Sequence, residues 1–496
     1  MDTYILVSPI VDLLLGKLGP LAYQPVFLMY GVEKDLEKLK TTLNTIKKGL
    51  LDAEKQQLHN SQVGDWLEEL KDVCYDAEDV FDEFQAEALR RQVLAERGSI
   101  PKKVYNALSW PTSLAFRFNI GHKIKEIRER LDEIASNHTR FGFMNIVETR
   151  INVRRWETHS FEVASEIIGR EKDKEECGTV DSHSHSISKR ARHLSFVEDN
   201  MIRDGVPSFL SDACRLRTIC FPFSGMTPTQ SFVESCISMF PFLRYLDLSF
   251  GSFVLVPKKL GNLRHLRYLN LGGNGKIKKL PNSICKLQSL QTLALEGCEE
   301  LQELPRDIRY LISLRFLWLT TNQTYLPHNG IERLNSLRSL YIKSCINLEY
   351  LVEDIGNLKA LRVLGIVGCP NLVSLPSSIQ CLSSLENLEL TDCEKLNLDW
   401  GMGMEEEDVH QDLNGTSSIK RLRLLYLSEL PQLVELPQWL RRCSANTLQW
   451  LIIKECPNLL ALHRLTTKSQ ITSSFGLSRS GISAARYAWP HYSGKN

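Results

Sequence analysis

The chain has 496 residues, of which 43% are hydrophobic and 24% charged, and its 60 Lys and Arg residues balance 59 Asp and Glu residues. This length predicts more than one domain, and the balanced charge gives no support to a nucleic-acid partner. No uninterrupted apolar run of about 18 residues occurs, so no transmembrane segment is predicted. The most apolar region, residues 4–30, also lacks the basic start of a secretory signal, so none is expected.

The first 140 residues predict a compact bundle of four antiparallel helices. An apolar segment near Leu13 would form the first helix, although Pro9, Pro20 and Pro25 argue against its continuity. Apolar residues spaced by three and four predict helices over residues 36–50 and 120–134 and a longer one from about residue 63 to 94. A long parallel coiled coil is less favoured, because no apolar stripe lasts about three or four heptads.

Residues 141–189 are expected to form a linker. His183 and His185 lie there in a polar run without Cys or carboxylate partners at ligand spacing, which favours a flexible junction over a metal site. No G-x-x-x-x-G-K-[ST] phosphate-binding loop occurs anywhere, and the nearest string, residues 272–277, ends on Ile277 in place of the hydroxyl residue. No set of nucleophile, base and orienting residue can be named either. We therefore expect a protein that is not an enzyme and that has neither catalytic residues, nor a cofactor, nor a metal.

From Leu243 to Cys456 the phrase Leu-x-x-Leu-x-Leu returns about every 24 residues. Its leucines alternate with polar or aromatic residues, which predicts short strands with one buried face. A second phrase that begins Leu-Pro would return the chain along the outer side. Because one unit cannot cover its own apolar face, the units must stack into a solenoid with a continuous parallel sheet.

This is the leucine-rich repeat pattern, and it predicts a horseshoe over residues 190–463 that opens with two weaker frames, at 191–196 and 216–221. The fold class is therefore a helical bundle followed by an α/β solenoid. An acidic run, residues 401–408, is expected to be a solvated loop, and residues 464–496 a poorly ordered tail.

A small residue is required eight positions after the first leucine of each phrase, where it points inward to meet backbone groups. Asn or Cys occupies this place in seven phrases: Asn274, Cys298, Asn322, Cys345, Cys369, Cys393 and Cys456. Five of the 13 cysteines are thus expected at buried structural positions rather than in disulfides. Reduced thiols in such number suggest a reducing compartment.

Three pieces of the sequence resemble plant intracellular immune receptors of the coiled-coil, nucleotide-binding, leucine-rich repeat class, of the RGA-like type. Residues 63–84 closely resemble the family's Rx-type coiled-coil domain, and their Glu78, Asp79, Val80, Phe81 and Asp82 match its EDVID motif with Phe in place of Ile. Residues 167–171 resemble the phrase before the nucleotide-binding domain, and residues 190–196 resemble the start of the repeats.

The resemblance implies a role in plant defence, in the cytoplasm, through protein recognition by the repeats. ADP or ATP would be expected for the family, but only residues 172–189 stand where its nucleotide-binding domain should lie. A truncated receptor, adaptor or regulator is therefore expected. The implied partners are a pathogen effector or a guarded host protein, full-length receptors, and a second bundle through self-association.

Candidate binding residues follow from the strand pattern. The third and fifth positions of each phrase project from the concave face, where exposed aromatic residues are typical anchors for a protein partner. Arg stands at the second position in six of nine phrases, the last of them at Arg423. The concave-face candidates are Arg244, Tyr245, Arg267, Tyr268, Arg315, Phe316, Trp318, Arg338, Tyr341, Arg362, Tyr426 and Trp450.

The acidic residues Glu78, Asp79 and Asp82 are a natural complement to these arginines. The resemblance implies that the EDVID helix packs against repeat arginines, so we expect the bundle to fold back onto the solenoid. Exposed ion pairs contribute only ~0–1 kcal/mol each, so such a contact would need several pairs and apolar support.

Four alternatives stay open from the sequence. A bare repeat scaffold for ubiquitin ligases is possible in principle but would leave the EDVID-like bundle unexplained. An extracellular receptor-like repeat protein would require paired cysteines flanking the solenoid and a cleavable signal, and neither is visible. A partner receptor could supply the complete nucleotide switch. Peripheral association with the plasma membrane is also left open.

Overall fold

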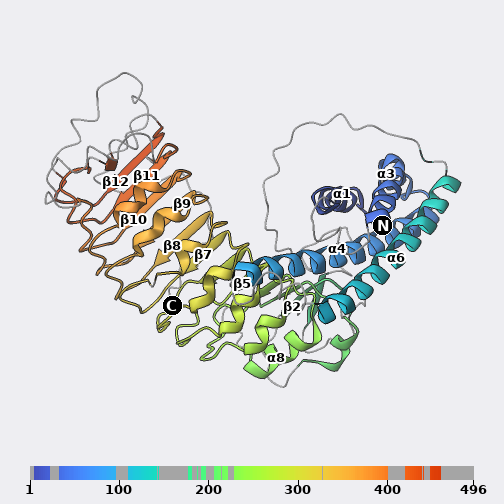
Figure 1. Ribbon diagram of the computed structural model, residues 1–496, viewed down its shortest axis with the longest axis horizontal. Coiled ribbons are helices and arrows are strands. Elements are labelled where there is room, and N and C mark those ends of the chain that lie inside the picture. Colours follow the sequence, from blue (N-terminus) through green and yellow to red (C-terminus); the bar gives the residue numbers. More distant parts are fainter. Residues whose placement is uncertain are drawn as a thin grey trace.

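The computed structural model describes residues 5–22, 33–96, 110–141, 143, 177–180, 187, 191–196, 206–213, 215–221, 228–326, 328–399, 419–437, 439–440 and 447–459. The expected acidic loop and C-terminal tail lie outside these residues. Figure 1 shows two parts, a helical bundle and a curved solenoid whose first repeats lie against the bundle.

The bundle consists of α1 (Ser8–Ala22), α3 (Glu33–Gln56), α4 (Ser61–Glu96) and α6 (Trp110–Phe141). Helices α1 and α6 each pack against both α3 and α4, and one apolar core joins all four. The indole N–H of Trp66 donates to the carbonyl of Ile134 at 3.0 Å, which ties α4 to the end of α6. The predicted four-helix bundle is confirmed.

Helix α1 is continuous from Ser8 to Ala22, so the expectation that Pro9 and Pro20 would interrupt it is wrong, while Pro25 lies outside the described residues. Pro9 stands in the first turn, where the missing N–H has no intrahelical acceptor to lose, and Pro20 stands in the last turn. Glu54 accepts hydrogen bonds from the backbone N–H groups of Val7 and Ser8, both at 2.7 Å, and so caps the positive end of the helix dipole. No helix in the described part of the chain is long and apolar enough to cross a membrane.

The described strands form one 12-stranded parallel sheet in which each strand pairs only with its neighbours in the sequence. The strands are β1 (Cys177–Val180), β2 (His193–Phe196), β3 (Thr218–Cys220), β4 (Tyr245–Asp247), β5 (Tyr268–Asn270), β6 (Thr292–Leu295), β7 (Phe316–Leu319), β8 (Ser339–Lys343), β9 (Val363–Val367), β10 (Asn387–Thr391), β11 (Leu424–Ser428) and β12 (Trp450–Lys454). Strand β1 lies in the segment expected to be a linker, so the sheet begins before residue 190.

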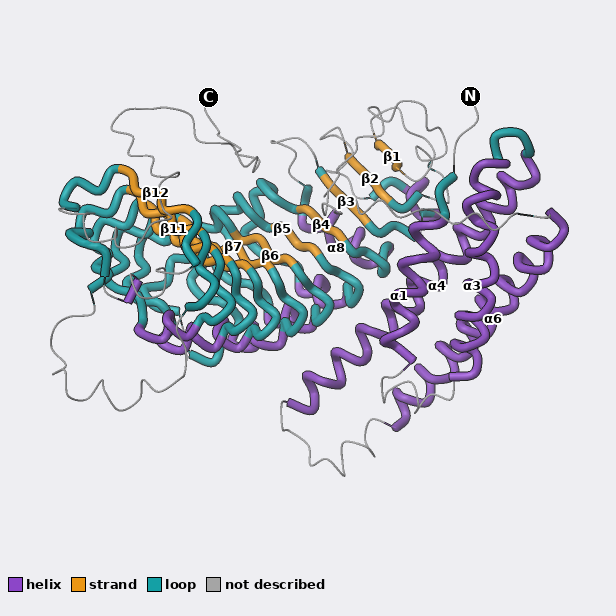
Figure 2. Tube along the Cα trace, turned by 90° about the horizontal axis from the view of Figure 1, so that it is seen from above, coloured by secondary structure: helices purple, strands orange, loops and turns teal. Residues whose placement is uncertain are grey.

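Short 3-10 helices return the chain along the outer side of the solenoid, opposite the strands (Figure 2). Five of them, at residues 208–212, 258–262, 282–286, 306–310 and 377–381, begin directly after a proline, and in the last three of these the proline belongs to a Leu-Pro phrase. One longer helix, α8 (Gln230–Met239), replaces them near the start of the solenoid. A single core of buried leucines runs through the repeats from residue 191 to 440.

The small inward residues behave as the repeat requires. The side-chain amide of Asn274 donates to the carbonyls of Leu248 at 2.9 Å and Leu271 at 2.7 Å, and its oxygen accepts from the N–H of Phe253 at 3.1 Å. Cys298, Cys345, Cys369 and Cys393 are buried as predicted, and Cys456 is half-buried.

Asn322 departs from this pattern, and the prediction that it points inward is wrong. Its side chain is exposed, and the neighbouring Thr321 is buried in its place. The hydroxyl of Thr321 donates to the carbonyl of Leu301 at 2.8 Å. A Thr hydroxyl can thus replace the amide of Asn, because the core needs one short donor at this level of the stack.

Candidate functional site

A helix of the bundle lies across the first strands of the solenoid and forms a network of ion pairs with it. Helix α4 provides the acidic residues, and the repeats provide arginines that each stand at the second position of a repeat phrase, directly before a strand. We name three of them, Arg217, Arg244 and Arg267, the first arginine triplet. The bundle therefore folds back onto the repeats, as the acidic face of its helix suggested.

The contacts of the first triplet are short. Arg217 lies 2.8 Å from both Glu78 and Asp79, and Arg267 lies 2.6 Å from Asp82. Arg244 stands between them and lies 2.9 Å from each of the three carboxylates. The helix thus moves by one strand for each of its turns, from β3 to β5.

The N-terminal side of this contact is closed by Tyr75. Its backbone carbonyl accepts from Arg217 at 2.9 Å, and its ring lies 4.7 Å from the guanidinium carbon of Arg217 and 4.9 Å from that of Arg192. These are cation–π distances. Asp76 adds a further ion pair, with Arg215 at 3.1 Å.

The network also reaches the first helix of the bundle. The Lys17 ammonium on α1 lies 2.8 Å from Glu78 and 3.0 Å from Asp82, whose side chains are both only 5% exposed. Burial opposes the ionisation of Glu78, but the charges of Arg244, Lys17 and Arg217 outweigh it and hold its pKa well below the usual range. The pKa of Asp82 is lowered by Arg244, Arg267 and Lys17, again against the effect of burial. Both carboxylates are therefore ionised at neutral pH.

The net stabilisation is smaller than the number of ion pairs suggests. Moving these charges out of water is costly, and only good geometry with further hydrogen bonds offsets that cost. The Nε atoms of Arg217 and Arg244 are buried without a hydrogen-bond partner. The contact is consequently most sensitive to the loss of one charge, which would leave its partners buried and underpaired.

The other residues of the acidic motif have a different place. Val80 and Phe81 are buried within the core of the bundle, so their side chains do not extend the ionic contact with the repeats. The helical period explains this, because residues 78, 79 and 82 share one face of α4 and residue 81 lies on another.

The remaining candidates on the strand face divide into a covered and an open group. Tyr245 and Tyr268 stack on each other beside the bundle, with ring centroids 4.1 Å apart. Burial, followed by the charges nearby, raises the pKa of both phenols. Farther along, Phe316 and Trp318 stack at 6.3 Å, and the Trp450 side chain is 53% exposed.

The open group also includes Tyr341, Tyr426 and four arginines. Within the described residues, Arg315, Arg338 and Arg423 form no ion pair, and Arg362 has only a distant one, 3.9 Å from Glu386. The structure therefore brings Arg244 and Arg267 together with the acidic helix and leaves the later arginines accessible.

Sequence reasoning missed six residues of this contact, namely Lys17, Tyr75, Asp76, Arg192, Arg215 and Arg217. Arg217 follows Leu216 at the second position of a weaker repeat phrase, a signal that could have identified it. Arg192 has the same position in the phrase before it. Lys17 gave no signal, because only the packing of α1 on α4 brings it to Glu78.

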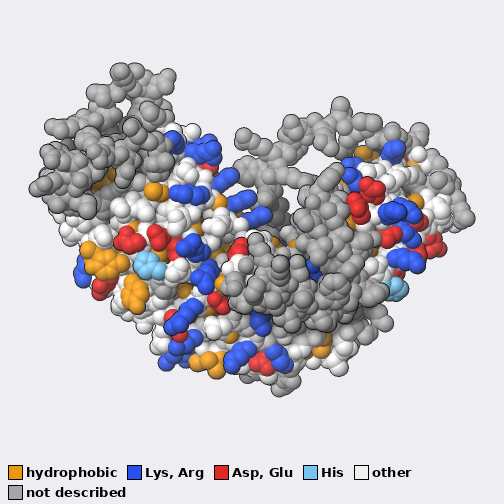
Figure 3. All heavy atoms as spheres, viewed as in Figure 1, with side chains coloured by type: hydrophobic (Ala, Val, Ile, Leu, Met, Phe, Trp, Pro, Cys, Tyr) orange, Lys and Arg blue, Asp and Glu red, His pale blue; other side chains and the backbone are white. Residues whose placement is uncertain are grey.

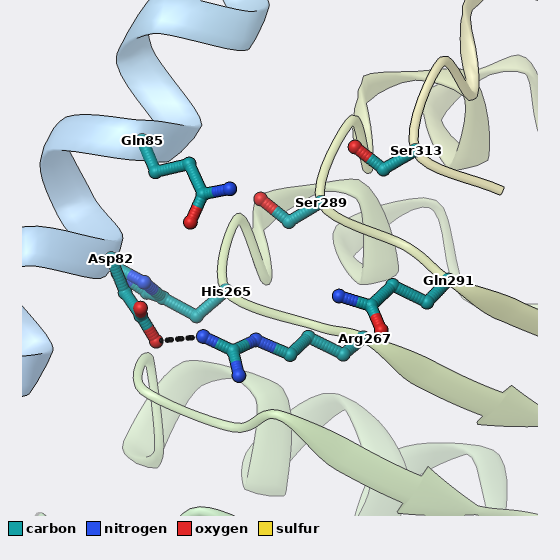
Figure 4. A pocket seen from close by; sticks show the side chains of 7 residues that line it. All are labelled: Asp82, Gln85, His265, Arg267, Ser289, Gln291 and Ser313. Atoms are coloured by element: carbon teal, nitrogen blue, oxygen red, sulfur yellow. Dashed lines mark hydrogen bonds and ion pairs between the residues drawn. The ribbon is translucent and has the colours of Figure 1, made fainter. Parts of the chain in front are cut away.

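A small polar cavity lies where α4 leaves the first triplet, and Figure 4 shows Gln85 of the helix facing Ser289 of the repeats. Its volume is about 20 Å³. That is room for about one water molecule and far too little for a nucleotide. The residues that line it are Asp82, Gln85, His265, Arg267, Ser289, Gln291 and Ser313. Among the described residues no cluster of His, Cys, Asp and Glu could hold a metal ion.

Two family models match the chain, the Rx N-terminal domain over residues 10–134 and a leucine-rich repeat region over residues 224–456. The putative disease resistance protein RGA4 of Solanum bulbocastanum is 29% identical over 167 residues, which are 34% of this chain and 16% of that protein. The putative disease resistance RPP13-like protein 1 of Arabidopsis thaliana is 36% identical over 149 residues, 29% of this chain and 14% of that protein.

The chain thus spans less than a fifth of these relatives' length. Among solved structures, the leucine-rich repeat domain of the type III effector XopL matches with a TM-score of 0.37 and 27% identity, covering 45% of this chain and 72% of that one. The chain thus carries an Rx-type bundle followed by a leucine-rich repeat region, and its sequence is similar to RGA-type and RPP13-like plant disease resistance proteins.

Proposed function

We propose that this chain acts in plant disease resistance as a recognition protein without catalytic activity, located in the cytoplasm. The observation that carries the proposal is the ionic contact between Glu78, Asp79 and Asp82 and the first arginine triplet. This contact joins the two regions that match resistance proteins into one unit. Recognition by the repeats can therefore change the state of the bundle.

The arrangement divides the concave face into two regions with separate tasks. The bundle occupies β3 to β5 through the first triplet, and the strands that follow keep aromatic and basic side chains available for a protein partner. The partner would be a pathogen effector, a guarded host protein or a full-length receptor. While the bundle is docked, its acidic residues are not free to contact another chain.

The proposed role does not include a nucleotide switch within this chain. A phosphate-binding loop is absent from its sequence, and the small cavity beside Asp82 holds about one water molecule. We propose instead that the protein acts as an adaptor or regulator of full-length receptors, which carry their own switch. A free bundle would be the part that associates with them or with a second bundle.

The test is complementation in the plant that carries the gene. Deletion of the gene should change the extent of infection by at least one pathogen in a panel, and the wild-type chain should restore it. A chain with Glu78→Lys and Asp82→Lys should fail to restore it while accumulating normally, because reversed charges would face Arg244. Unchanged infection after deletion, or full rescue by the double variant, would contradict the proposal.

A further inference from the structure

The arginine column of the solenoid continues beyond the bundle in the same backbone register. Along the first triplet, the N–H of Arg244 donates to the carbonyl of Arg217, and the N–H of Arg267 to that of Arg244, both at 2.7 Å. Gln291 then interrupts the column on the next repeat. After it the same bonds, at 2.8 Å, join Arg315, Arg338 and Arg362, which we name the second arginine triplet.

The two triplets differ in what covers them. The exposed fraction of the side chain rises from 7% at Arg217 to 13% at Arg244 and 32% at Arg267, as the acidic face of α4 ends. At Arg362, in the second triplet, it is 55%. In Figure 3, Lys and Arg side chains gather along the concave edge of the repeats that the bundle leaves open.

We propose that the second arginine triplet, with the aromatic residues beside it, is a docking site for an acidic amphipathic α-helix of another protein. This inference rests on the proposed function and specifies the chemistry of its partner. The first triplet provides the template, since it already holds a helix of that kind across its strands.

The match between helix and strands has a geometric basis. An α-helix rises ~5.4 Å per turn, and neighbouring strands of a sheet lie ~4.8 Å apart. A helix laid across the strands therefore presents one side chain to each strand when its contact residues are three or four positions apart. In α4 this series is Tyr75, Glu78 and Asp79, Asp82 and Gln85, which meet successive repeats.

The chain's own helix cannot serve the second triplet. Its acidic residues Glu78, Asp79 and Asp82 are held by the first triplet, and its next contact residue, Gln85, lines the cavity opposite Gln291 (Figure 4). The partner helix must then come from another chain. Glu386 follows Arg362 in the column, so the last acidic residue of the partner helix should meet Arg362. One turn later, a basic residue of the partner helix would pair with Glu386.

Aromatic side chains next to the second triplet supply the apolar half of the site. Trp318, Tyr341 and Gly365 are paired across β7, β8 and β9. The Tyr341 ring lies over Gly365, where an added Cβ would be 2.3 Å from the ring. Such a ring is held in place before binding, which lowers the entropy cost of using it as an anchor. The partner helix should therefore carry leucines or similar residues beside its carboxylates.

The test measures binding of a labelled helical peptide to the full chain by fluorescence anisotropy. The probe is an alanine-based peptide of about 20 residues, with Glu at four-residue spacing and Leu on the adjoining face. A peptide of the same composition with the Glu positions scattered around the helix is its control. We expect the spaced peptide to bind about tenfold more tightly than the scattered one, and less tightly at high ionic strength.

Variants of the full chain locate the binding. Arg338→Glu, at the centre of the second triplet, should weaken the binding of the spaced peptide about tenfold or more. Arg333→Glu makes the same charge change at an exposed position of an outer 3-10 helix and should leave binding within about twofold. Unchanged thermal melting of both variants would show that the fold is intact.

Several outcomes would overturn the docking site. The two peptides could bind with equal affinity, or Arg338→Glu and Arg333→Glu could weaken peptide binding equally. Alternatively, Arg244→Glu could weaken peptide binding while Arg338→Glu leaves it unchanged. A dimer of the full chain that Arg338→Glu dissociates would overturn the assignment to another protein, since the occupant would be a second copy. If the peptide experiment fails but complementation in the plant succeeds, the docking site alone is refuted. If the peptide binds as expected but complementation fails, the proposed function alone is refuted.

Discussion

Arg244 is the position at which the contact between bundle and repeats can be tested most sharply. Its side chain is 13% exposed and lies 2.9 Å from each of Glu78, Asp79 and Asp82. Leaving a buried charge wholly unpaired costs ~3–5 kcal/mol, but these carboxylates keep Lys17 and the other two arginines. We therefore expect Arg244→Ala to weaken the contact by about 2–3 kcal/mol, comparable to one lost charged hydrogen bond.

Urea unfolding of the full chain can measure this loss. Because each part binds only the folded form of the other, the contact adds its free energy to whichever part unfolds first. Helical signal at 222 nm reports chiefly on the bundle, and hydrogen exchange of the strand amides reports on the solenoid. Arg244 lies on the repeats and outside the bundle core, so a shift in the bundle transition must pass through the contact.

Arg338→Ala is the matched control. It removes the same side chain from the same position of a later repeat, where no described residue forms an ion pair with it. Its effect on either transition should stay within about 0.5 kcal/mol. If both variants shift the transitions equally, or if Arg244→Ala shifts neither, the ion pairs do not hold the two parts together and the reasoning fails.

Three further predictions test the network and the repeat core. The folded-state pKa values of Glu78 and Asp82 lie below the unfolded values near 4, so the stabilisation from these carboxylates is complete above about pH 4 and is lost as the pH falls further. The loss of stability caused by Arg244→Ala, measured in urea, should therefore shrink below about pH 4. A loss that stays the same at low pH would contradict the assigned role of these two carboxylates. Asn274→Ala removes three hydrogen bonds to buried backbone groups and should lower the free energy of unfolding by about 3 kcal/mol. Asn322→Ala, at an exposed site, should change it by less than about 0.5 kcal/mol, and equal urea midpoints of the two variants would refute this difference. Gly261→Ala would place a Cβ 2.3 Å from the carbonyl oxygen of Ser283 and should lower the free energy of unfolding by about 1–3 kcal/mol. Gly64→Ala, in open space on α4, should leave the melting temperature unchanged or raise it. A Gly261 variant that melts like the wild type would contradict the predicted clash.

Periodicity allowed much of the fold to be predicted from the sequence. Apolar spacing of three and four residues located the bundle helices, and the repeat phrase located the strands from β4 to β12. Both signals are local, because a helix or a strand buries one face with a fixed period. The errors lay where a local rule met tertiary context: α1 includes Pro9 and Pro20 near its ends, and Thr321 occupies the inward place predicted for Asn322.

The candidate site was predictable only in part. An acidic helix face and a column of arginines are visible in the sequence, and their opposite charges suggest a contact. Which arginines take part is not visible, since all stand at equivalent positions of equivalent repeats. The structure uses Arg217, Arg244 and Arg267 and leaves Arg315, Arg338 and Arg362 open.

The sequence by itself thus determined the two architectures and the chemistry of their facing surfaces, because each follows from patterns within about 40 residues. Only the tertiary structure decided where one surface meets the other. The residues bonded between the bundle and the first arginine triplet are 138 to 185 positions apart in the chain, so no local pattern could set their register. That register depends on how α1 and α4 pack, which brings Lys17 to Glu78, and on the match between a helical turn and the spacing of the strands.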